Sequence, residues 1–423
     1  MREMKDSGIE WIGEIPKDWC VKNGKYVFNV YGMSVNDDFI SDTVEESYKI
    51  KYYKVDNLNE ATEQFYVKSN FANFSIKIYE IKGPIILVPK RGGAIYTNKV
   101  RIEKEACLFD SNIMGLTTNN NVRFMAYVLY GRGLSDIGDV TTIPQINKKH
   151  IDVLKIPVPS INEQEVIVEY LDTKCSEIDA TAEDIQKEIT LLEDYKKSLV
   201  YNVISNGINH SIYSTESDEV WGNLPQGWKL VDIKYLFEIV KRIAGKEGYD
   251  VLSVTQKGLK IKDITSGDGQ LADNYCGYQF VYPTDYVMNH MDLLTGWVDC
   301  SELFGVTSPD YRVFRLIDRS AHNLVYYKYV MQCCYMNKIF YSLGQGVSNL
   351  GRWRLQTSSF NNFKIPVPPK DEQDEIADYL DTKCSEIDSL IADKKRQLDI
   401  LADYKKSLIY EYVTGKKEVP VNE

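Results

Sequence analysis

Long hydrophobic runs are missing from this sequence. Its longest apolar stretch is short, 83–89, whereas a helix that crosses a membrane needs about 20 predominantly apolar residues. The first residues, Met1–Asp6, also lack the apolar core of a secretion signal. We therefore expect neither a membrane span nor a secretion signal.

Cysteine and histidine are scarce, with 8 and 4 residues. The cysteines form no Cys-x-x-Cys pair, and no two histidines have the spacing of metal ligands. Scattered cysteines in a large chain without a secretion signal are typical of a reducing compartment. We predict a cytoplasmic protein with no metal site, whose cysteines are small core residues.

Motifs of catalysis are missing as well. There is no Gly-x-x-x-x-Gly-Lys-Ser/Thr phosphate loop, and no Asn-Pro-Pro-aromatic or Asp-Pro-Pro-aromatic methyltransferase signature. The four histidines have no nearby serine or cysteine arrangement that requires a catalytic triad. The sequence predicts no catalytic residue and no bound cofactor.

What the chain does contain is an internal duplication at an offset of 209 residues. The matching segments are 15–19 with 224–228, 156–159 with 365–368, 170–179 with 379–388, and 194–199 with 403–408. Between these anchors the halves look unrelated. A chain of 423 residues is too long for one core. The repeat divides it into a variable domain (1–155), a shared segment (156–210), a second variable domain (211–364) and the shared segment again (365–423).

Each shared segment predicts one long helix. Prolines keep the preceding chain extended, and Asn162 and Asp371 are the expected N-caps. About 40 residues at ~1.5 Å per residue make a helix of about 60 Å. Gly207 and Gly415 stand where the helices should end.

Hydrophobic residues in these helices alternate in steps of three and four, which is the pattern of a coiled coil. The seam residues are Val168, Leu171, Cys175, Ile178, Ala182, Ile185, Ile189, Leu192, Leu199 and Val203, and then Ala377, Leu380, Cys384, Ile387, Ile391, Leu398, Leu401 and Leu408. Lys196, Lys394 and Lys405 interrupt the seam and are expected to extend toward solvent, or to mark where the packing changes.

Polar residues outside the seam are identical in the two copies. They are Asp172, Lys174 and Glu177, repeated as Asp381, Lys383 and Glu386. A two-stranded seam does not need identical outer residues, and a recent duplication should have left the variable domains similar too. We infer that both helices offer one surface to two equivalent partners, with chance identity as the alternative.

The acidic residues are concentrated in the helices. The chain has 50 basic and 61 acidic residues, a formal net charge of −11, which argues against a simple basic nucleic-acid binder. Residues 163–201 carry −7 and residues 371–410 carry −5, so the variable domains are close to neutral. A near-neutral domain can still present a basic face to phosphates.

The variable domains mix short strands with helices, which predicts an α+β fold. Residues 76–81 alternate like a half-buried strand, and 85–88 look like a covered strand. Residues 311–316 alternate with two arginines that we place on one face. Residues 124–130 and 324–340 are predicted to be aromatic-rich core helices.

Two polar, glycine-bearing, basic loops, 89–101 and 344–354, are candidate contacts for DNA. Lysine and arginine suit phosphate or guanine, whereas asparagine and glutamine suit adenine. Ordinary solvated hairpins are an equally good interpretation of both loops. The predicted DNA-binding residues are Lys90, Arg91, Tyr96, Asn98, Lys99, Arg132, Arg312, Gln345, Asn349, Arg352 and Arg354.

The whole pattern resembles the specificity (S) subunits of type I restriction–modification systems. The matching residues are Ile-Pro-x-Pro-x-x-x-Glu-Gln at 156–164 and 365–373, each opening a long helix, and Ile/Leu-Pro-x-x-Trp at 15–19 and 224–228. Residues 290–297, followed by 305–311, also look like a stretch common in these recognition domains. The first variable domain matches only at its edges and around 83–93.

The resemblance implies two helices packed as an antiparallel spacer with a pseudo-two-fold relation. Each variable domain would be a target recognition domain that reads one half of a split, asymmetric site in double-stranded DNA. Two modification subunits would supply S-adenosylmethionine-dependent adenine methylation, two restriction subunits would use ATP and Mg, and this chain would carry no chemistry. The implied docking residues are Glu163, Gln164, Asp172, Lys174, Glu177, Glu372, Gln373, Asp381, Lys383 and Glu386.

Two other classes of protein stay open at this point. One is a coiled-coil scaffold whose variable domains bind proteins or glycans. The other is a stand-alone nuclease, which needs a metal-binding carboxylate cluster that the sequence does not reveal.

Overall fold

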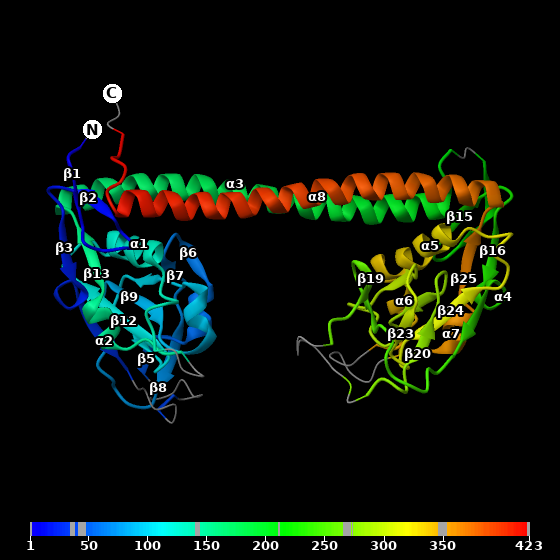
Figure 1. Cartoon of the computed structure of the whole chain (residues 1–423), viewed down its shortest axis with the longest axis horizontal. Helices are drawn as coiled ribbons and strands as arrows, with labels where there is room; N and C mark the ends of the chain where they lie inside the picture. Colours follow the sequence, from blue (N-terminus) through cyan, green and yellow to red (C-terminus); the bar gives the residue numbers. More distant parts are fainter. Residues whose placement is uncertain are drawn as a thin grey trace. The chain divides into compact units, whose positions relative to one another are not determined.

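The chain forms two compact units (Figure 1). The computed structural model describes residues 2–33, 39–40, 48–139, 144–209, 212–264, 272, 274–345 and 353–420. Unit 1 consists of residues 1–186 and 396–423, and unit 2 of residues 187–395. Each unit therefore combines one variable region with a part of both shared segments. In the described part of the chain, no helix is long and apolar enough to cross a membrane.

The two shared segments form the long helices α3 (Ile161–Asn206) and α8 (Lys370–Val413). The Ser160 hydroxyl accepts a hydrogen bond from the amide three residues on, at 3.3 Å. Ser160 therefore caps α3, and the predicted cap Asn162 lies one residue inside the helix. The predicted cap Asp371 likewise lies in the first turn of α8.

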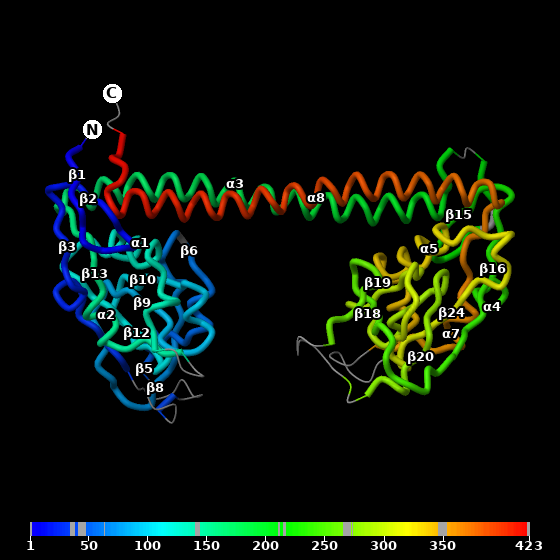
Figure 2. The backbone as a smooth tube through the Cα atoms, in the orientation of Figure 1, coloured from blue at the N-terminus to red at the C-terminus, as the bar shows by residue number. Residues whose placement is uncertain are grey.

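In unit 1, α3 and α8 run antiparallel. Lys405 donates to both carboxylate oxygens of Asp179 at 2.7 Å, and the rings of Tyr170 and Tyr412 lie 4.6 Å apart. Later residues of α8 thus contact earlier residues of α3, which is the arrangement of antiparallel helices. Figure 2 lets the reader follow this pairing along the backbone.

The same antiparallel pairing occurs in unit 2. Lys196 donates to the carboxylate of Asp388 at 2.6 and 2.7 Å, and Lys394 pairs with Glu188 at 2.5 Å. The predicted coiled-coil pairing is confirmed within each unit. The lysines that interrupt the seam form ion pairs between the helices.

Two two-stranded sheets tie the shared segments to the start of a variable region. They pair β3 (Cys20–Asn23) with β13 (Lys155–Val158), and β16 (Lys229–Asp232) with β25 (Lys364–Val367). Two hairpins lie within the variable regions, β1 (Met4–Asp6) with β2 (Glu14–Pro16) and β14 (Tyr213–Asp218) with β15 (Gly222–Pro225). The repeated Ile-Pro-Val-Pro is thus an extended strand, and prolines are tolerated in such two-stranded pairs.

Unit 1 contains a six-stranded and a three-stranded sheet. The larger has the order β4 (Phe28–Gly32), β12 (Ile113–Thr118), β9 (Ile85–Pro89), β10 (Arg101–Glu103), β7 (Tyr66–Val67) and β6 (Ala61–Glu63). The smaller has the order β11 (Leu108–Phe109), β5 (Tyr48–Tyr53) and β8 (Phe71–Phe74). The core helix α1 (Val122–Arg132) confirms the predicted helix at 124–130.

Unit 2 is built on a four-stranded sheet with two small sheets beside it. The order is β17 (Phe237–Val240), β24 (Arg312–Leu316), β21 (Tyr286–Met288) and β22 (Val298–Cys300). The small sheets pair β18 (Leu252–Thr255) with β19 (Gly258–Ile261), and β20 (Gln279–Val281) with β23 (Gly305–Thr307). The predicted helix at 324–340 is interrupted, because α5 (Leu324–Met336) ends before α6 (Ile339–Ser342).

The two units share a topology that their sequences hide. The order β4-β12-β9-β10 matches β17-β24-β21-β22, with every neighbouring pair antiparallel. In each unit one buried cluster joins the variable region to both long helices. The remaining elements are η1 (Gly24–Tyr26), η3 (Val55–Asn59), η4 (Gly92–Thr97), α2 (Lys148–Val153), α4 (Ile233–Leu236) and α7 (Thr357–Asn361).

One strand prediction is wrong and another needs a correction. Residues 76–81 form no strand, and Tyr79 is 92% exposed, because β8 ends at Phe74 and Ile81 makes only an isolated bridge. The strand at 311–316 exists as β24. However, its pleat turns Arg312 inward and leaves Arg315 on the other face, since neighbouring side chains in a strand alternate.

Candidate nucleic-acid interface

A tryptophan–glutamate hydrogen bond fixes the start of each unit to its long helix. Trp19 donates its indole N–H to Glu163 Oε2 at 3.0 Å. Trp228 donates to Glu372 Oε2 at 2.9 Å. The Ile/Leu-Pro-x-x-Trp start and the Glu-Gln signature, which the sequence repeats far apart, are therefore partners in the structure.

The glutamine of the same signature holds the start of a core helix. Gln164 accepts a hydrogen bond from the amide of Asn121, the N-cap of α1, at 2.9 Å, and donates to the Pro159 carbonyl at 3.0 Å. In unit 2, Gln373 accepts from the amide of Asn323, the N-cap of α5, at 2.9 Å. Both glutamines are buried, at 0% and 1% exposure.

A tyrosine makes a second repeated attachment to the long helices. Tyr127 of α1 donates its hydroxyl to Asp172 at 2.8 Å, and Tyr329 of α5 donates to Asp381 at 2.7 Å. Each tyrosine follows its N-cap asparagine by six residues. The asparagines and tyrosines of the two units correspond at an offset of 202 residues, whereas the shared segments correspond at 209. A comparison of the two halves at the offset of 209 therefore missed them. An Asn-x-x-x-x-x-Tyr pattern was the signal in the sequence that could have revealed them.

The cysteines of the repeat lie beside these tyrosines and are core residues, as predicted. Cys175 is 0% and Cys384 is 4% exposed. Burial raises the pKa of the Cys175 thiol to about 11, and it raises the pKa of Cys384 as well. Neither thiol is an activated nucleophile.

The predicted docking residues divide into two groups. Glu163, Gln164, Asp172, Glu372, Gln373 and Asp381 all bond within their own unit. The buried glutamines have no surface to offer, which does not fit a docking contact. Lys174 and Glu177 pair at 2.8 Å on an accessible face of α3, and Lys383 and Glu386 do the same on α8.

In unit 1 the loop after β9 carries cations with no side-chain partner among the described residues. These are Lys90, Arg91 and Lys99, and Tyr96 beside them is 62% exposed. The backbone of this loop is fixed, because Gly92 bonds to the Pro144 carbonyl at 2.9 Å. A rigid loop with free positive charge suits contact with a phosphate or a base edge.

Two predicted DNA contacts of unit 1 have other roles. Asn98 adopts a left-handed conformation with φ of 49°, ends η4 and donates to the Tyr130 carbonyl at 2.8 Å. Arg132 makes a two-pronged ion pair with Asp136 at 2.8 and 2.9 Å and lies over the Trp11 ring. Their side chains are engaged inside unit 1, which does not fit base readout.

In unit 2, Gln345 and Arg354 are exposed and face each other in an isolated antiparallel bridge. Arg354 has no ion-pair partner among the described residues. Arg312 is 4% exposed, donates to the Leu355 carbonyl at 3.1 Å and lies over the Phe360 ring, and burial lowers its pKa to about 10. Arg312 is thus a core residue. The predicted contacts Asn349 and Arg352 lie outside the described residues.

The predicted loops 89–101 and 344–354 occupy different positions in an arrangement that both units share. In unit 1 the Lys90 carbonyl, at the end of β9, accepts from the amide of Ile146 at 2.9 Å. In unit 2 the His290 carbonyl, just after β21, accepts from the amide of Leu355 at 3.0 Å. Ile146 and Leu355 are related by the 209-residue offset. Each unit thus pairs the loop after its central strand with the segment before its last short helix, and the sequence identified only one member of each pair.

Among the residues that the structure describes, no three His, Cys, Asp or Glu side chains gather in a way that could hold a metal ion. Burial, and then Arg312 and Arg354, lower the pKa of His290 to about 3, so this histidine is neutral at physiological pH.

Known proteins are similar to this chain in sequence. Over 96% of this chain, the sequence is 24% identical to the type I restriction enzyme MjaVIII specificity subunit of Methanocaldococcus jannaschii, of which 94% is covered. The putative MjaX specificity subunit of the same organism is also 24% identical, with 96% of each chain covered.

Solved structures show the same fold. The HsdS subunit from Thermoanaerobacter tengcongensis aligns with a TM-score of 0.50 and 13% identity, over 97% of this chain and 100% of that chain. A chain from a structural study of complex assembly in the type I R-M system aligns with a TM-score of 0.66 and 13% identity, over 94% and 98%. The family model for the type I restriction modification DNA specificity domain matches residues 16–191 and 225–399. Because these two matches follow the internal repeat and cover most of the sequence, the chain belongs to that family.

Proposed function

We propose that this chain is the sequence-specific DNA-binding subunit of a type I restriction–modification complex, and that each unit reads one half of a split, asymmetric site. The observation that carries this proposal is the shared loop arrangement. Both units contain four strands in the same order, and in both the loop after the central strand bonds to the segment before the last short helix. This arrangement carries Lys90, Arg91 and Lys99 in unit 1 and Arg354 in unit 2, none of which has an ion-pair partner among the described residues. The variable sequences of these loops would give each unit its own half-site.

The proposed DNA contacts are those predicted residues that the structure leaves at the surface. They are Lys90, Arg91, Tyr96 and Lys99 in unit 1, and Gln345 and Arg354 in unit 2. To these we add the loop 289–296 of unit 2, the counterpart of the basic loop of unit 1. Gly296 makes its turn possible, since a Cβ there would lie 2.0 Å from the Asp292 carbonyl oxygen.

The long helices present two equivalent accessible surfaces to partners. In unit 1 the ion pair with Glu177 raises the pKa of Lys174, and nearby Tyr404 adds to it. In unit 2 the ion pair with Glu386 likewise raises the pKa of Lys383, and Tyr379 and Tyr195 add to this. Tyr195 and Tyr404 are 57% and 54% exposed, and the 209-residue offset relates them. An accessible aromatic beside an ion pair, present twice, suits two copies of one partner.

We infer that these partners are two DNA methyltransferase subunits, which supply S-adenosylmethionine-dependent adenine methylation. Two restriction subunits that use ATP and Mg would complete the complex in the cytoplasm. This chain would supply binding and positioning but no chemistry.

Alanine substitutions test the proposed contacts. Arg91→Ala and Arg354→Ala should each weaken retention of specific duplex DNA by the chain with its methyltransferase partner. Loss of a base contact costs about 1–3 kcal/mol and relaxes one position of the site, whereas loss of a phosphate contact lowers the salt slope by about 1. Lys68→Ala and Arg315→Ala are matched controls, because these cations are accessible but already paired with Glu60 and Glu238.

Two outcomes would contradict the proposal. If both variants retain the affinity and salt slope of the parent, the loops are not the interface. If the complex shows no salt-dependent DNA affinity at all, a scaffold for proteins or glycans is the better interpretation, although no observation on the structure favours it. Removal of one heptad from both helices should change the gap between half-sites and leave the half-sites unchanged, which sequencing of methylated adenines would measure.

A further inference from the structure

An exposed lysine–tyrosine pair stands at the same place in both units. Lys25 and Tyr26 in unit 1 correspond to Lys234 and Tyr235 in unit 2 at the 209-residue offset. The two tyrosines are 71% and 68% exposed, and the lysine ammonium lies over the ring at 4.7 Å in unit 1 and 5.0 Å in unit 2. Rings that are so exposed contribute little to the core of their own unit, and their repetition indicates a ligand outside it.

Strand pairing brings a second repeated lysine to each pair. Lys155 lies opposite the residue two before Lys25, and Lys364 lies opposite the residue two before Lys234. Lys155 and Lys364 are also exposed and also correspond at the 209-residue offset. We call these two places the Lys–Tyr corners, which consist of Lys25, Tyr26 and Lys155 in unit 1, and of Lys234, Tyr235 and Lys364 in unit 2.

Each corner is joined to a candidate reading loop in the same way. In unit 1, segment 146–154 begins at its hydrogen bond to the loop after β9 and ends at Leu154, whose carbonyl accepts from the amide of Gly24 at 2.7 Å. In unit 2, segment 355–363 begins at its hydrogen bond to the loop after β21, and the Phe363 carbonyl accepts from the amide of Ile233 at 2.9 Å. Both segments have the same number of residues and contain the last short helix, α2 or α7.

The sheet of unit 1 gives the distance between its corner and its loop. Strand β4 follows the corner, β9 precedes the loop, and both strands pair with β12. Phe28 lies opposite Thr118, and Pro89 lies opposite Ile113. Five residues of strand at ~3.3 Å each make about 17 Å, which is about five base pairs at ~3.4 Å each. A duplex in contact with the loop is therefore long enough to reach the corner.

Positive charge is concentrated around both corners. The segments that form them carry +4 in unit 1 (20–26 and 148–155) and +2 in unit 2 (229–235 and 357–364), whereas the variable domains as a whole are close to neutral. The one acidic residue of α2 pairs with Lys148 at 2.6 Å, and α7 has no acidic residue. Neither short helix thus presents an unpaired carboxylate to a polyanion.

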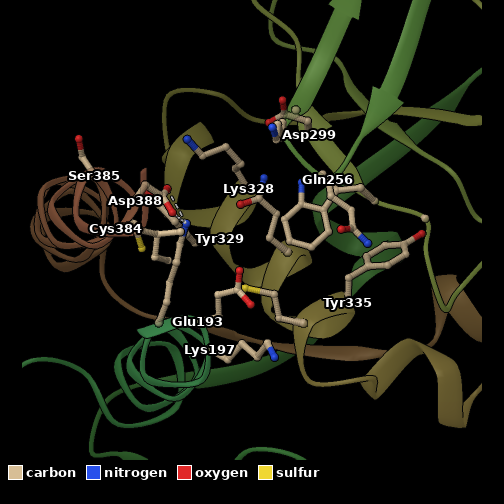
Figure 3. A pocket seen from close by; sticks show the side chains of 18 of the residues that line it. Glu193, Lys197, Gln256, Asp299, Lys328, Tyr329, Tyr335, Cys384, Ser385 and Asp388 are labelled. Carbon is tan, nitrogen blue, oxygen red and sulfur yellow. Dashed lines mark hydrogen bonds and ion pairs between the residues drawn. The ribbon is translucent and has the colours of Figure 1, made fainter. Parts of the chain in front are cut away.

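Three corner lysines have no ion-pair partner among the described residues, namely Lys25, Lys155 and Lys364. Lys234 is the exception, since it pairs with Asp232 at 3.0 Å. Other lysines are more often engaged. In the cavity of about 890 Å³ in unit 2 (Figure 3), four of the six lysines of the lining lie 2.6–3.8 Å from a carboxylate oxygen. Unpaired lysines beside an exposed phenolic hydroxyl suit phosphate oxygens.

We propose that both Lys–Tyr corners bind the phosphate backbone of DNA beside each half-site, without reading its sequence. The lysines would neutralise phosphates, and the tyrosine hydroxyl would donate a hydrogen bond to a phosphate oxygen. The corners are alike although the reading loops differ, so their ligand has to be common to both half-sites, as the sugar–phosphate backbone is. The inference rests on the proposed function and deepens it, because it assigns positioning contacts to residues outside the reading loops.

DNA retention by the chain with its methyltransferase partner tests the proposal at several salt concentrations. One duplex carries the half-sites found by sequencing of methylated adenines, and the other has a random sequence. Lys25→Ala/Tyr26→Ala should weaken binding of both duplexes by the same factor, on the order of tenfold, and should lower the salt slope by about 1. Lys234→Ala/Tyr235→Ala should have a smaller effect, because Lys234 is already paired. Lys25→Arg keeps the positive charge and should bind like the parent.

Lys68→Ala/Tyr79→Ala is the matched control, because it removes an accessible lysine and a 92% exposed tyrosine elsewhere in unit 1. This variant should keep both affinities. The inference is overturned if Lys25→Ala/Tyr26→Ala retains the affinity and salt slope of the parent, if it affects only the duplex with the half-sites, or if the control acts alike. It is also overturned if the variant loses the methyltransferase partner while the assembled complex keeps its DNA affinity, since the corner would then bind protein. Arg91→Ala and Arg354→Ala report separately on the reading loops, so the proposed function and this inference can fail independently.

Discussion

Replacement of the signature glutamine by leucine separates a structural role from a docking role. Gln164 is fully buried, accepts from the amide of Asn121 at 2.9 Å and donates to the Pro159 carbonyl at 3.0 Å. Gln164→Leu keeps the approximate volume of the side chain but leaves both backbone groups buried without a partner. A residue that served only to dock a partner would show no such loss in the isolated chain.

The magnitude follows from those two backbone groups. Each buried donor or acceptor left unsatisfied costs about 1–3 kcal/mol, and the leucine side chain offsets part of this through better apolar burial. We expect a loss of about 3 kcal/mol in the local stability of α1. This corresponds to roughly 150-fold faster amide hydrogen exchange in Val122–Arg132.

Hydrogen exchange followed by mass spectrometry resolves the two units in one experiment. Gln164→Leu should affect α1 and spare α5, while Gln373→Leu should do the reverse, because Gln373 accepts from the amide of Asn323. Glu165→Leu, at an exposed position of α3, is the control. If exchange in α1 changes less than about fivefold, which is about 1 kcal/mol, or if both helices respond equally, the anchoring role is refuted.

Three further changes have defined outcomes. Lys405 Nζ lies 2.7 Å from Asp179 Oδ1, and the pair is partly exposed. A double-mutant cycle on the two residues should therefore give a coupling free energy of about 0.2–1 kcal/mol that declines in high salt. A larger coupling free energy that does not depend on salt would show that the pair is buried. Phe65→Ala, at a 6% exposed position, should lower the unfolding free energy of unit 1 by about 3–5 kcal/mol in urea titrations, and a loss below about 1 kcal/mol would mean that the ring is not packed. Burial lowers the pKa of His290 from 6.5 to about 3, so its contribution to stability is present above pH 6.5 and is lost as the pH falls from 6.5 toward 3. The stability difference between the parent and His290→Gln should therefore change by about 1.4 kcal/mol per pH unit in that window, and a pH-independent difference would contradict the shift.

Features that depend on neighbouring residues were predictable. The seam of α3 and α8 follows from hydrophobic spacing, because an α-helix returns to the same face every three or four residues. Both helix ends fall at the predicted glycines, Gly207 and Gly415, with φ of 71° and 70°. Both N-caps were predicted two residues too late, because α3 begins at Ile161 after Ser160 and α8 begins at Lys370. For α3, serine and asparagine both suit the cap position.

Strand faces were harder to predict than helix faces. The alternation at 76–81 had the right period, yet Ile76 is 44% exposed because no strand among the described residues pairs with this segment. A strand exists only when a partner satisfies its backbone groups, and that partner is distant in sequence. Arg312 was predicted at the surface, whereas the pleat and the Leu355 carbonyl draw it into the core.

The sequence by itself determined the duplication, the two long helices and the family resemblance, because spacing, prolines and glycines act locally. Only the tertiary structure decided which polar residues are structural and which stay at the surface. Gln164 and Asn121 are 43 residues apart, whereas Gln373 and Asn323 are 50 apart, so no single offset relates the two pairs. Contacts of this kind form between faces that the chain brings together only after folding, and a one-dimensional pattern does not record them.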